Sequence, residues 1–126
     1  MATVLVAADG AWIRDQVRPA LSGPHLELIE VHRGQEVRDV VASRPLDLVI
    51  LDLQIANMGG VAVAIDLHLE ASGDRLPSVP ILLLLDREHD RFLAKRAAAD
   101  AELVKPIDPG TLRRTVKALL GQRAGV

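Results

Sequence analysis

Three carboxylates and one ammonium group stand at the ends of apolar runs in this chain of 126 residues. Neighbouring carboxylates repel each other unless a cation lies between them, and Mg²⁺ needs only one or two carboxylates together with water. A lysine supplies positive charge for a phosphoryl group, and an aspartate can form an acyl phosphate. The residue types therefore predict Mg²⁺ and phosphoryl chemistry, with Asp52 as a metal ligand or as a nucleophile. In chain order the four residues are Asp9, Asp52, Asp86 and Lys105.

Strands and helices alternate along the chain, and their order predicts where these side chains lie. Apolar, partly β-branched runs predict strands at 3–8, 26–31, 47–52, 79–85 and 101–104. Helical spacing of apolar residues predicts helices at 11–21, 34–43, 61–71, 87–98 and 109–120. Such alternation predicts a parallel sheet with helices on both faces, whose ligands bind at the carboxyl ends of the strands. If the strand order is 2-1-3-4-5, Asp9 and Asp52 are neighbours.

The helices carry their own boundary signals. Pro19 lies inside the first helical pattern and is expected to kink it or to end it early. Asp108 is expected to cap the last helix, and Gly121 is expected to stop it. The third helix is expected to bury a face formed by Val61, Ile65, His68 and Leu69.

Composition excludes several classes of protein. Hydrophobic residues make up 49% of the chain, so it can bury a core, and we expect a single domain over 1–126. Without cysteine there is no disulfide framework, no thiolate zinc site and no cysteine nucleophile. The run 79–85 is far shorter than the ~20 residues that cross a bilayer, and a net charge of −2 favours neither nucleic acid nor an anionic membrane. We therefore expect a cytoplasmic protein that binds no membrane and no nucleic acid through this domain.

Three stretches of the chain resemble the receiver domain of two-component response regulators, the CheY-like family. The strongest is 46–60, LDLVILDLQIANMGG, which resembles the family's phospho-acceptor strand and the loop after it. The others are 79–84, which resembles the fourth strand, and 99–106, which ends in a Lys-Pro pair typical of the family. The resemblance implies a flavodoxin-like α/β fold: a doubly wound, five-stranded parallel sheet in the order 2-1-3-4-5 with five helices.

The resemblance also implies a role for each residue of the site. Asp52 is the expected phospho-acceptor, and Lys105 the expected contact to the phosphoryl oxygens. Asp9, Asp52 and the backbone carbonyl of Gln54 are the expected Mg²⁺ ligands, while Asp86 is either a substitute ligand or a loop acid. The expected donor is a histidine kinase or a phosphotransfer protein, and no enzyme is expected beyond acceptance of the group by the chain itself. A second copy or a downstream protein is expected on the helix 87–98, the strand 101–104 and the last helix.

Five positions depart from the family's pattern. Ala8 replaces one of the two acids after the first strand, which predicts weak Mg²⁺ binding. Leu85 replaces the Thr or Ser that hydrogen-bonds the phosphoryl group, and leucine cannot do so. Glu102 replaces the aromatic residue of the usual switch, so phosphorylation is expected to shift the conformation only weakly. Asp86 replaces a small residue and adds negative charge, and Ala56 replaces a proline in the loop after the acceptor.

Two other functions use the same residues. A pseudo-receiver would serve as a protein-binding module without phosphorylation, and the pair of Asp52 and Lys105 would then be structural only. A small Mg²⁺-dependent phosphatase would share the carboxylates, although the chain has neither a glycine-rich phosphate loop nor an evident general base. We expect a lone receiver domain with no output domain after Val126, and a piece of a longer regulator is an equal alternative.

Overall fold

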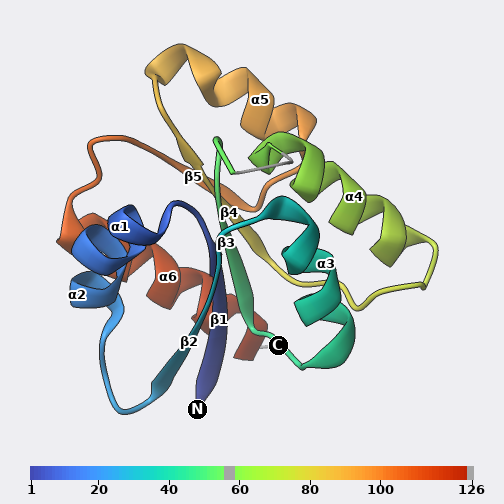
Figure 1. Cartoon of the computed structure of the whole chain (residues 1–126), viewed down its shortest axis with the longest axis horizontal. Coiled ribbons are helices and arrows are strands. Elements are labelled where there is room, and N and C mark those ends of the chain that lie inside the picture. The colour runs from blue at the N-terminus through green and yellow to red at the C-terminus, as the bar shows by residue number, and fades with distance from the viewer. Residues whose placement is uncertain (56–58, 125–126) are drawn as a thin grey trace.

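A sheet of five parallel strands forms the centre of the computed structural model, which describes residues 1–55 and 59–124 (Figure 1). The strand order is β2-β1-β3-β4-β5, which confirms the predicted fold. β4 begins two residues later than predicted, after Pro80, which has no N–H for a sheet hydrogen bond. The strands are β1 (Ala2–Ala7), β2 (Leu26–Val31), β3 (Leu48–Asp52), β4 (Ile81–Leu85) and β5 (Ala101–Val104).

Five helical segments cover the sheet in the described part of the chain. The first and last segments pack on one face, and the other three pack on the opposite face (Figure 1). No helix in these residues is long and apolar enough to cross a membrane. The first segment joins α1 (Gly10–Trp12), the π-helical turn η1 (Ile13–Val17) and α2 (Arg18–Leu21). The others are α3 (Gly34–Ser43), α4 (Gly60–Ser72), the 3-10 turn η2 (Glu88–Asp90) with α5 (Arg91–Arg96), and α6 (Pro109–Ala124).

The alternation of side chains along β1 explains why both faces need helices. Val4 and Val6 belong to the core cluster that packs against η1, α2 and α6. Leu5 and Ala7 belong to the opposite cluster, which packs against α3, α4 and α5. β3 and β4 are buried along their whole length. Strands covered on both faces have continuous apolar sequences, and therefore the acidic residue that ends β3 stands out.

The first helix does not end early at Pro19. A regular helix brings the proline ring against the carbonyl four residues earlier, and that residue, Asp15, lies in the wider π-helical turn. In this turn the N–H of Arg18 donates to the carbonyl of Ile13, five residues back. The helix then continues to Leu21, so a local widening accommodates the proline.

The buried face of α4 differs from the predicted one. Val63, Ala64 and Leu67 are buried, whereas Ile65 and Leu69 are 39% and 58% exposed. Apolar residues occur all around this helix, so their spacing alone does not select a face. Gly60, the first residue of α4, is buried on the same side of the helix as Val63, Ala64 and Leu67.

The start of α6 was predicted correctly, whereas the ends of α5 and α6 differ from the predicted ones. Asp108 caps α6 as predicted, because its Oδ2 accepts a hydrogen bond of 3.0 Å from the N–H of Thr111. α6 continues past Gly121 to Ala124, since a glycine stop needs a left-handed backbone and no described glycine has a positive φ. The segment predicted over 87–98 already ends at Arg96, and Ala98 takes a φ of 55° just beyond it.

Candidate functional site

Asp52 is the centre of the candidate site. It is the last residue of β3 and only 4% exposed, and among the described residues it is the only charged one that is buried. The apolar residues before it hold β3 between β1 and β4, so the backbone delivers this carboxylate to the carboxyl edge of the sheet. A buried carboxylate is costly unless it has partners.

Lys105 is the cationic partner of Asp52. Its Nζ lies 2.8 Å from Oδ1 of Asp52. The N–H of Lys105 donates to the carbonyl of Leu85 at 2.9 Å, which keeps the residue after β5 beside the end of β4. The Lys105–Pro106 peptide bond is cis. The structure thus brings together the two residues that the sequence placed at the ends of the third and fifth strands.

Asp86 and Gln54 extend this pair into a network. Oδ1 of Asp86 lies 3.2 Å from Nζ of Lys105, and Oδ2 accepts a 2.9 Å hydrogen bond from Nε2 of Gln54. The N–H of Gln54 also donates to Oδ1 of Asp52 at 3.3 Å. Asp86 is therefore not an isolated loop acid. The side-chain role of Gln54 was not predicted, because only its backbone carbonyl matters to the family pattern.

Asp9 lies at the same edge of the sheet. It follows β1, whose Ala7 pairs with Leu51 of β3. Its carboxylate caps the first helix, where Oδ2 accepts a 3.3 Å hydrogen bond from the N–H of Trp12. Asp9 is exposed, whereas Ala8 before it is fully buried and contributes to the core.

The oxygen donors at this edge fit Mg²⁺ in kind. Asp9, Asp52 and the carbonyl of Gln54 are hard ligands, and Mg²⁺ requires no more than one or two carboxylates plus water. Among the described residues no group of three or more His, Cys, Asp and Glu side chains is arranged to hold a metal. The donor set is therefore a sparse one that water molecules would have to complete.

Trp12 lies over Lys105 from the first helix. Its ring centroid is 5.2 Å from Nζ, within the range of a cation–π contact. A tryptophan three residues after Asp9, on the first helix, can lie beside the site or pack in the core. The ring does pack against the core cluster of the first face, so it serves both purposes.

Gly60 is a residue of the site that sequence analysis missed. It begins α4, and its N–H donates to the carbonyl of Leu53 at 3.0 Å. A Cβ atom at this position would lie 2.1 Å from the carbonyl oxygen of Asp52, so the backbone would have to shift to admit any side chain. The Gly59-Gly60 pair was visible as a loop signal, but its distance from the acceptor strand was not.

Residues 4–117 match the family model of the response regulator receiver domain. The chain belongs to this family. An uncharacterized response regulatory protein of Mycobacterium tuberculosis is 36% identical over 124 residues, which cover 93% of this chain and 90% of that protein. The KDP operon transcriptional regulatory protein KdpE of Escherichia coli is 32% identical over 95% of this chain and 52% of its own length. The response regulator protein TrrA of Thermotoga maritima, in complex with Mg²⁺ and BeF, has a TM-score of 0.79 at 28% identity, over 94% of this chain and 99% of that one.

This receiver domain is thus a component of two-component signalling. Receiver domains interact with histidine kinases or phosphotransfer proteins, and they generally bind Mg²⁺. Membership of this family is therefore consistent with the carboxylates and the lysine at the carboxyl edge of the sheet.

Leu85 and Glu102, the two positions at which the resemblance places the switch residues, have different surroundings. Leu85 is fully buried and belongs to the core cluster of the second face. Glu102 is held by Arg91, whose Nη1 lies 3.1 Å from Oε1, and hydrogen bonds to Glu88 and Glu102 raise the pKa of that guanidinium. The remaining departure, Ala56, lies outside the described residues. These two positions therefore carry packing and a surface ion pair.

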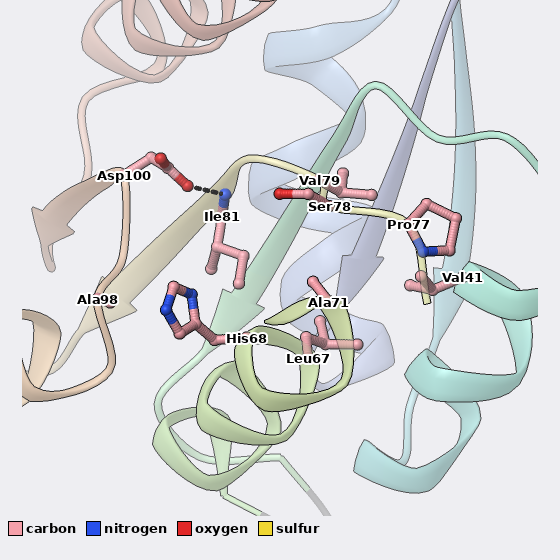
Figure 2. A pocket seen from close by; sticks show the side chains of 10 residues that line it. All are labelled: Val41, Leu67, His68, Ala71, Pro77, Ser78, Val79, Ile81, Ala98 and Asp100. Atoms are coloured by element: carbon pink, nitrogen blue, oxygen red, sulfur yellow. Dashed lines mark hydrogen bonds between the residues drawn. The ribbon is translucent and has the colours of Figure 1, made fainter. Parts of the chain in front are cut away.

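A hollow at the opposite edge of the sheet offers no rival site. Figure 2 shows that His68 of α4 and Ile81, the first residue of β4, line it, and its volume is about 120 Å³. Its one carboxylate belongs to Asp100, which accepts a 2.7 Å hydrogen bond from the N–H of Ile81. That carboxylate is occupied in holding the start of β4.

Proposed function

We propose that this receiver domain accepts a phosphoryl group on the carboxylate of Asp52. The expected donor is a phosphohistidine of a histidine kinase or of a phosphotransfer protein. The observation that carries the proposal is the buried carboxylate at the end of β3 with an ammonium group 2.8 Å away. A pair of this kind combines a nucleophile with a fixed positive charge for the incoming oxygens.

The transfer forms an O–P bond from Asp52 and breaks the N–P bond of the donor. The donor imidazole leaves with the electron pair of that bond and takes up a proton. Both hydrogen bonds that described residues donate to Asp52 fall on Oδ1, so Oδ2 is the oxygen proposed to attack. Lys105 offsets the negative charge on the phosphoryl oxygens during the transfer.

We propose weak Mg²⁺ binding by Asp9, Asp52 and the backbone carbonyl of Gln54. When bound, the ion would neutralise charge on the acceptor and on the phosphoryl oxygens. The support for weak binding is Ala8, which supplies a buried methyl group where the family has a second acid. Fewer carboxylates mean less electrostatic attraction for the ion.

Intact mass spectrometry tests the proposal. The protein is incubated with phosphoramidate and Mg²⁺, and an addition of one phosphoryl group is expected. The addition should disappear in Asp52→Asn and in the absence of Mg²⁺. A folded wild-type protein that gains no phosphoryl group, or an Asp52→Asn variant that still gains one, would contradict it.

The second candidate is a pseudo-receiver that binds a partner whether or not it is phosphorylated. Leu85 and the Arg91–Glu102 pair favour it, because neither responds directly to a phosphoryl group. The proposed contact surface for a second copy or a downstream protein comprises α5, β5 and α6. Binding of a partner with equal affinity to wild type and to Asp52→Asn would favour this candidate.

We further propose a cytoplasmic protein with one domain over 1–126. It turns over no separate substrate, and this domain binds neither membrane nor nucleic acid. Support comes from the absence of cysteine and from the net charge of −2.

A further inference from the structure

Asp86 shares the lysine on which the proposed transfer depends. Its Oδ1 lies 3.2 Å from Nζ of Lys105, and Oδ1 of Asp52 lies 2.8 Å from the same nitrogen. Gln54 holds the other oxygen of Asp86 at 2.9 Å. We propose that Asp86 is a resident anion, a carboxylate that occupies Lys105 in the free protein and competes with the incoming phosphoryl group for it.

The balance of charge around Lys105 gives the reason for this competition. One ammonium group faces two carboxylates, so the cluster is already negative before an anion arrives. Phosphorylation replaces the single negative charge of the Asp52 carboxylate with the roughly two of an acyl phosphate, so it adds about one further negative charge. While Asp86 stays on Lys105, the incoming anion meets a lysine that is already neutralised and a second carboxylate that repels it. Asp86 is therefore a positioning residue, and the phosphoryl group binds more favourably once the Asp86 side chain has left Lys105.

The surroundings of Asp86 allow its side chain to leave. It is 29% exposed and lines an open hollow of about 350 Å³ beside Gln54, Arg87 and His89. The backbone of Lys105 is bonded to the carbonyl of Leu85, and its Nζ keeps the 2.8 Å contact to Oδ1 of Asp52 when Asp86 leaves. Release of Lys105 thus requires a side-chain rotation of Asp86 and no movement of the sheet.

The competing interpretation is that Asp86 is a substitute Mg²⁺ ligand, and it predicts the opposite effect of removing the charge. A resident anion weakens the binding of a phosphoryl group, whereas a metal ligand strengthens it through the ion. The inference rests on the proposed function, since Lys105 matters to the transfer only if Asp52 receives the group.

Titration with beryllofluoride at a fixed Mg²⁺ concentration, followed by ¹⁹F NMR, tests the inference without chemistry at phosphorus. Asp86→Asn keeps the size of the side chain and removes its charge, and we expect the apparent Kd to fall about tenfold. Glu88→Gln is the matched control, because this acid lies two residues away, is 74% exposed and pairs with Arg91. Its Kd should stay within about twofold of wild type. Emission of Trp12, the only tryptophan and 5.2 Å from Nζ, gives a second readout.

Phosphorylation kinetics supply the complementary measurement. With phosphoramidate, Asp86→Asn should reduce the half-saturating donor concentration about tenfold and change the maximal rate much less. A lower maximal rate without a lower half-saturating donor concentration would indicate a structural role and overturn the inference.

The outcomes separate the inference from the proposed function. An Asp86→Asn protein that binds beryllofluoride no more tightly than wild type, including the case in which neither binds it, overturns the inference. Weaker binding together with a greater Mg²⁺ requirement would identify a metal ligand instead. If no protein gains a phosphoryl group, the proposed function fails, and the ratio of the two beryllofluoride constants still decides the inference.

Discussion

At the end of β3 a buried carboxylate meets an ammonium group at 2.8 Å, whereas one strand away β4 ends in a leucine with no exposed surface. We call Asp52, Lys105, Asp86 and Gln54 the acceptor half of this edge, and Leu85, Glu102 and Arg91 the switch half. The acceptor half is a connected polar network. The switch half consists of core packing and one surface ion pair.

Under the proposed function, the two tasks of a receiver domain fall to different residues. Accepting a phosphoryl group needs a nucleophile and positive charge, and the acceptor half has both. Transmitting the event needs a contact that differs in strength between the two states. In the switch half no hydroxyl and no aromatic side chain stands at the positions that supply such a contact in the family.

Restoring a hydroxyl at the end of β4 should have the largest effect on stability. Leu85→Thr removes buried apolar volume and places a hydroxyl among apolar neighbours. We expect the free energy of unfolding to fall by about 3 kcal/mol in urea denaturation. Leu83→Thr, on the same strand and in the same core cluster, is the matched control with a similar cost. Only Leu85→Thr should enlarge the response to phosphorylation, and equal responses would show that the missing hydroxyl does not limit the switch.

Crowding the acceptor half should have the next largest effect. Gly60→Ala would place a Cβ atom 2.1 Å from the carbonyl of Asp52, and the backbone must shift to avoid it. We expect a loss of about 2 kcal/mol in the free energy of unfolding, together with slower phosphorylation. Gly59→Ala is the control, because its nearest atom would be 3.6 Å away. Equal stability of the two variants would contradict the close approach.

The response of the wild type to phosphorylation should be confined to the acceptor half. Amide shifts in ¹H–¹⁵N spectra are expected to change strongly near Asp52, Asp86 and Lys105. Changes over 88–98 and at Glu102 should be much smaller, because Leu85 has no hydroxyl to bond the new group and Glu102 has no aromatic ring. Amide shift changes of equal size in both halves would contradict this prediction.

The smallest expected effect lies outside both halves and supplies a baseline. Arg18 lowers the pKa of Glu30 below its ordinary value of 4.5. A carboxyl pKa that is lower in the folded state contributes stability above the unfolded value, and this contribution is lost as the pH falls through the folded value. The loss should be slight because the Arg18 side chain is 53% exposed, so solvent screens the pair. In urea unfolding, the free energy of unfolding should differ slightly less between neutral and acidic pH for Glu30→Gln than for wild type.

The strands were the most predictable elements. β3 and β4 are covered on both faces, and this burial requires the unbroken apolar runs that predicted them. The face of α4 was predicted wrongly, because apolar residues surround that helix and periodicity selects no side. Of the two outcomes expected at Pro19, a kink or an early end, the early end was wrong, since a π-helical turn admits the ring.

The acceptor pair was predictable for a topological reason. Parallel strands bring their carboxyl ends to one edge, so a residue that ends a strand has a known location before any coordinates exist. Strand order makes Asp9 and Asp52 neighbours. Lys105 follows β5, one strand beyond β4, and its long side chain reaches Asp52 across the end of β4. The link from Asp86 to Gln54 joins two loops, and strand order does not determine how far side chains reach across loops.

Residue order alone therefore determined the parallel sheet and the edge at which Asp9, Asp52 and Lys105 gather, because burial on two faces and right-handed connections leave few arrangements. The strand order was implied by the resemblance to the family. Tertiary structure decided which partners share Lys105, that Gly60 must lack a side chain, and that Leu85 is part of the core. These properties depend on distances of a few ångströms between segments far apart in the chain, and no local pattern encodes such distances.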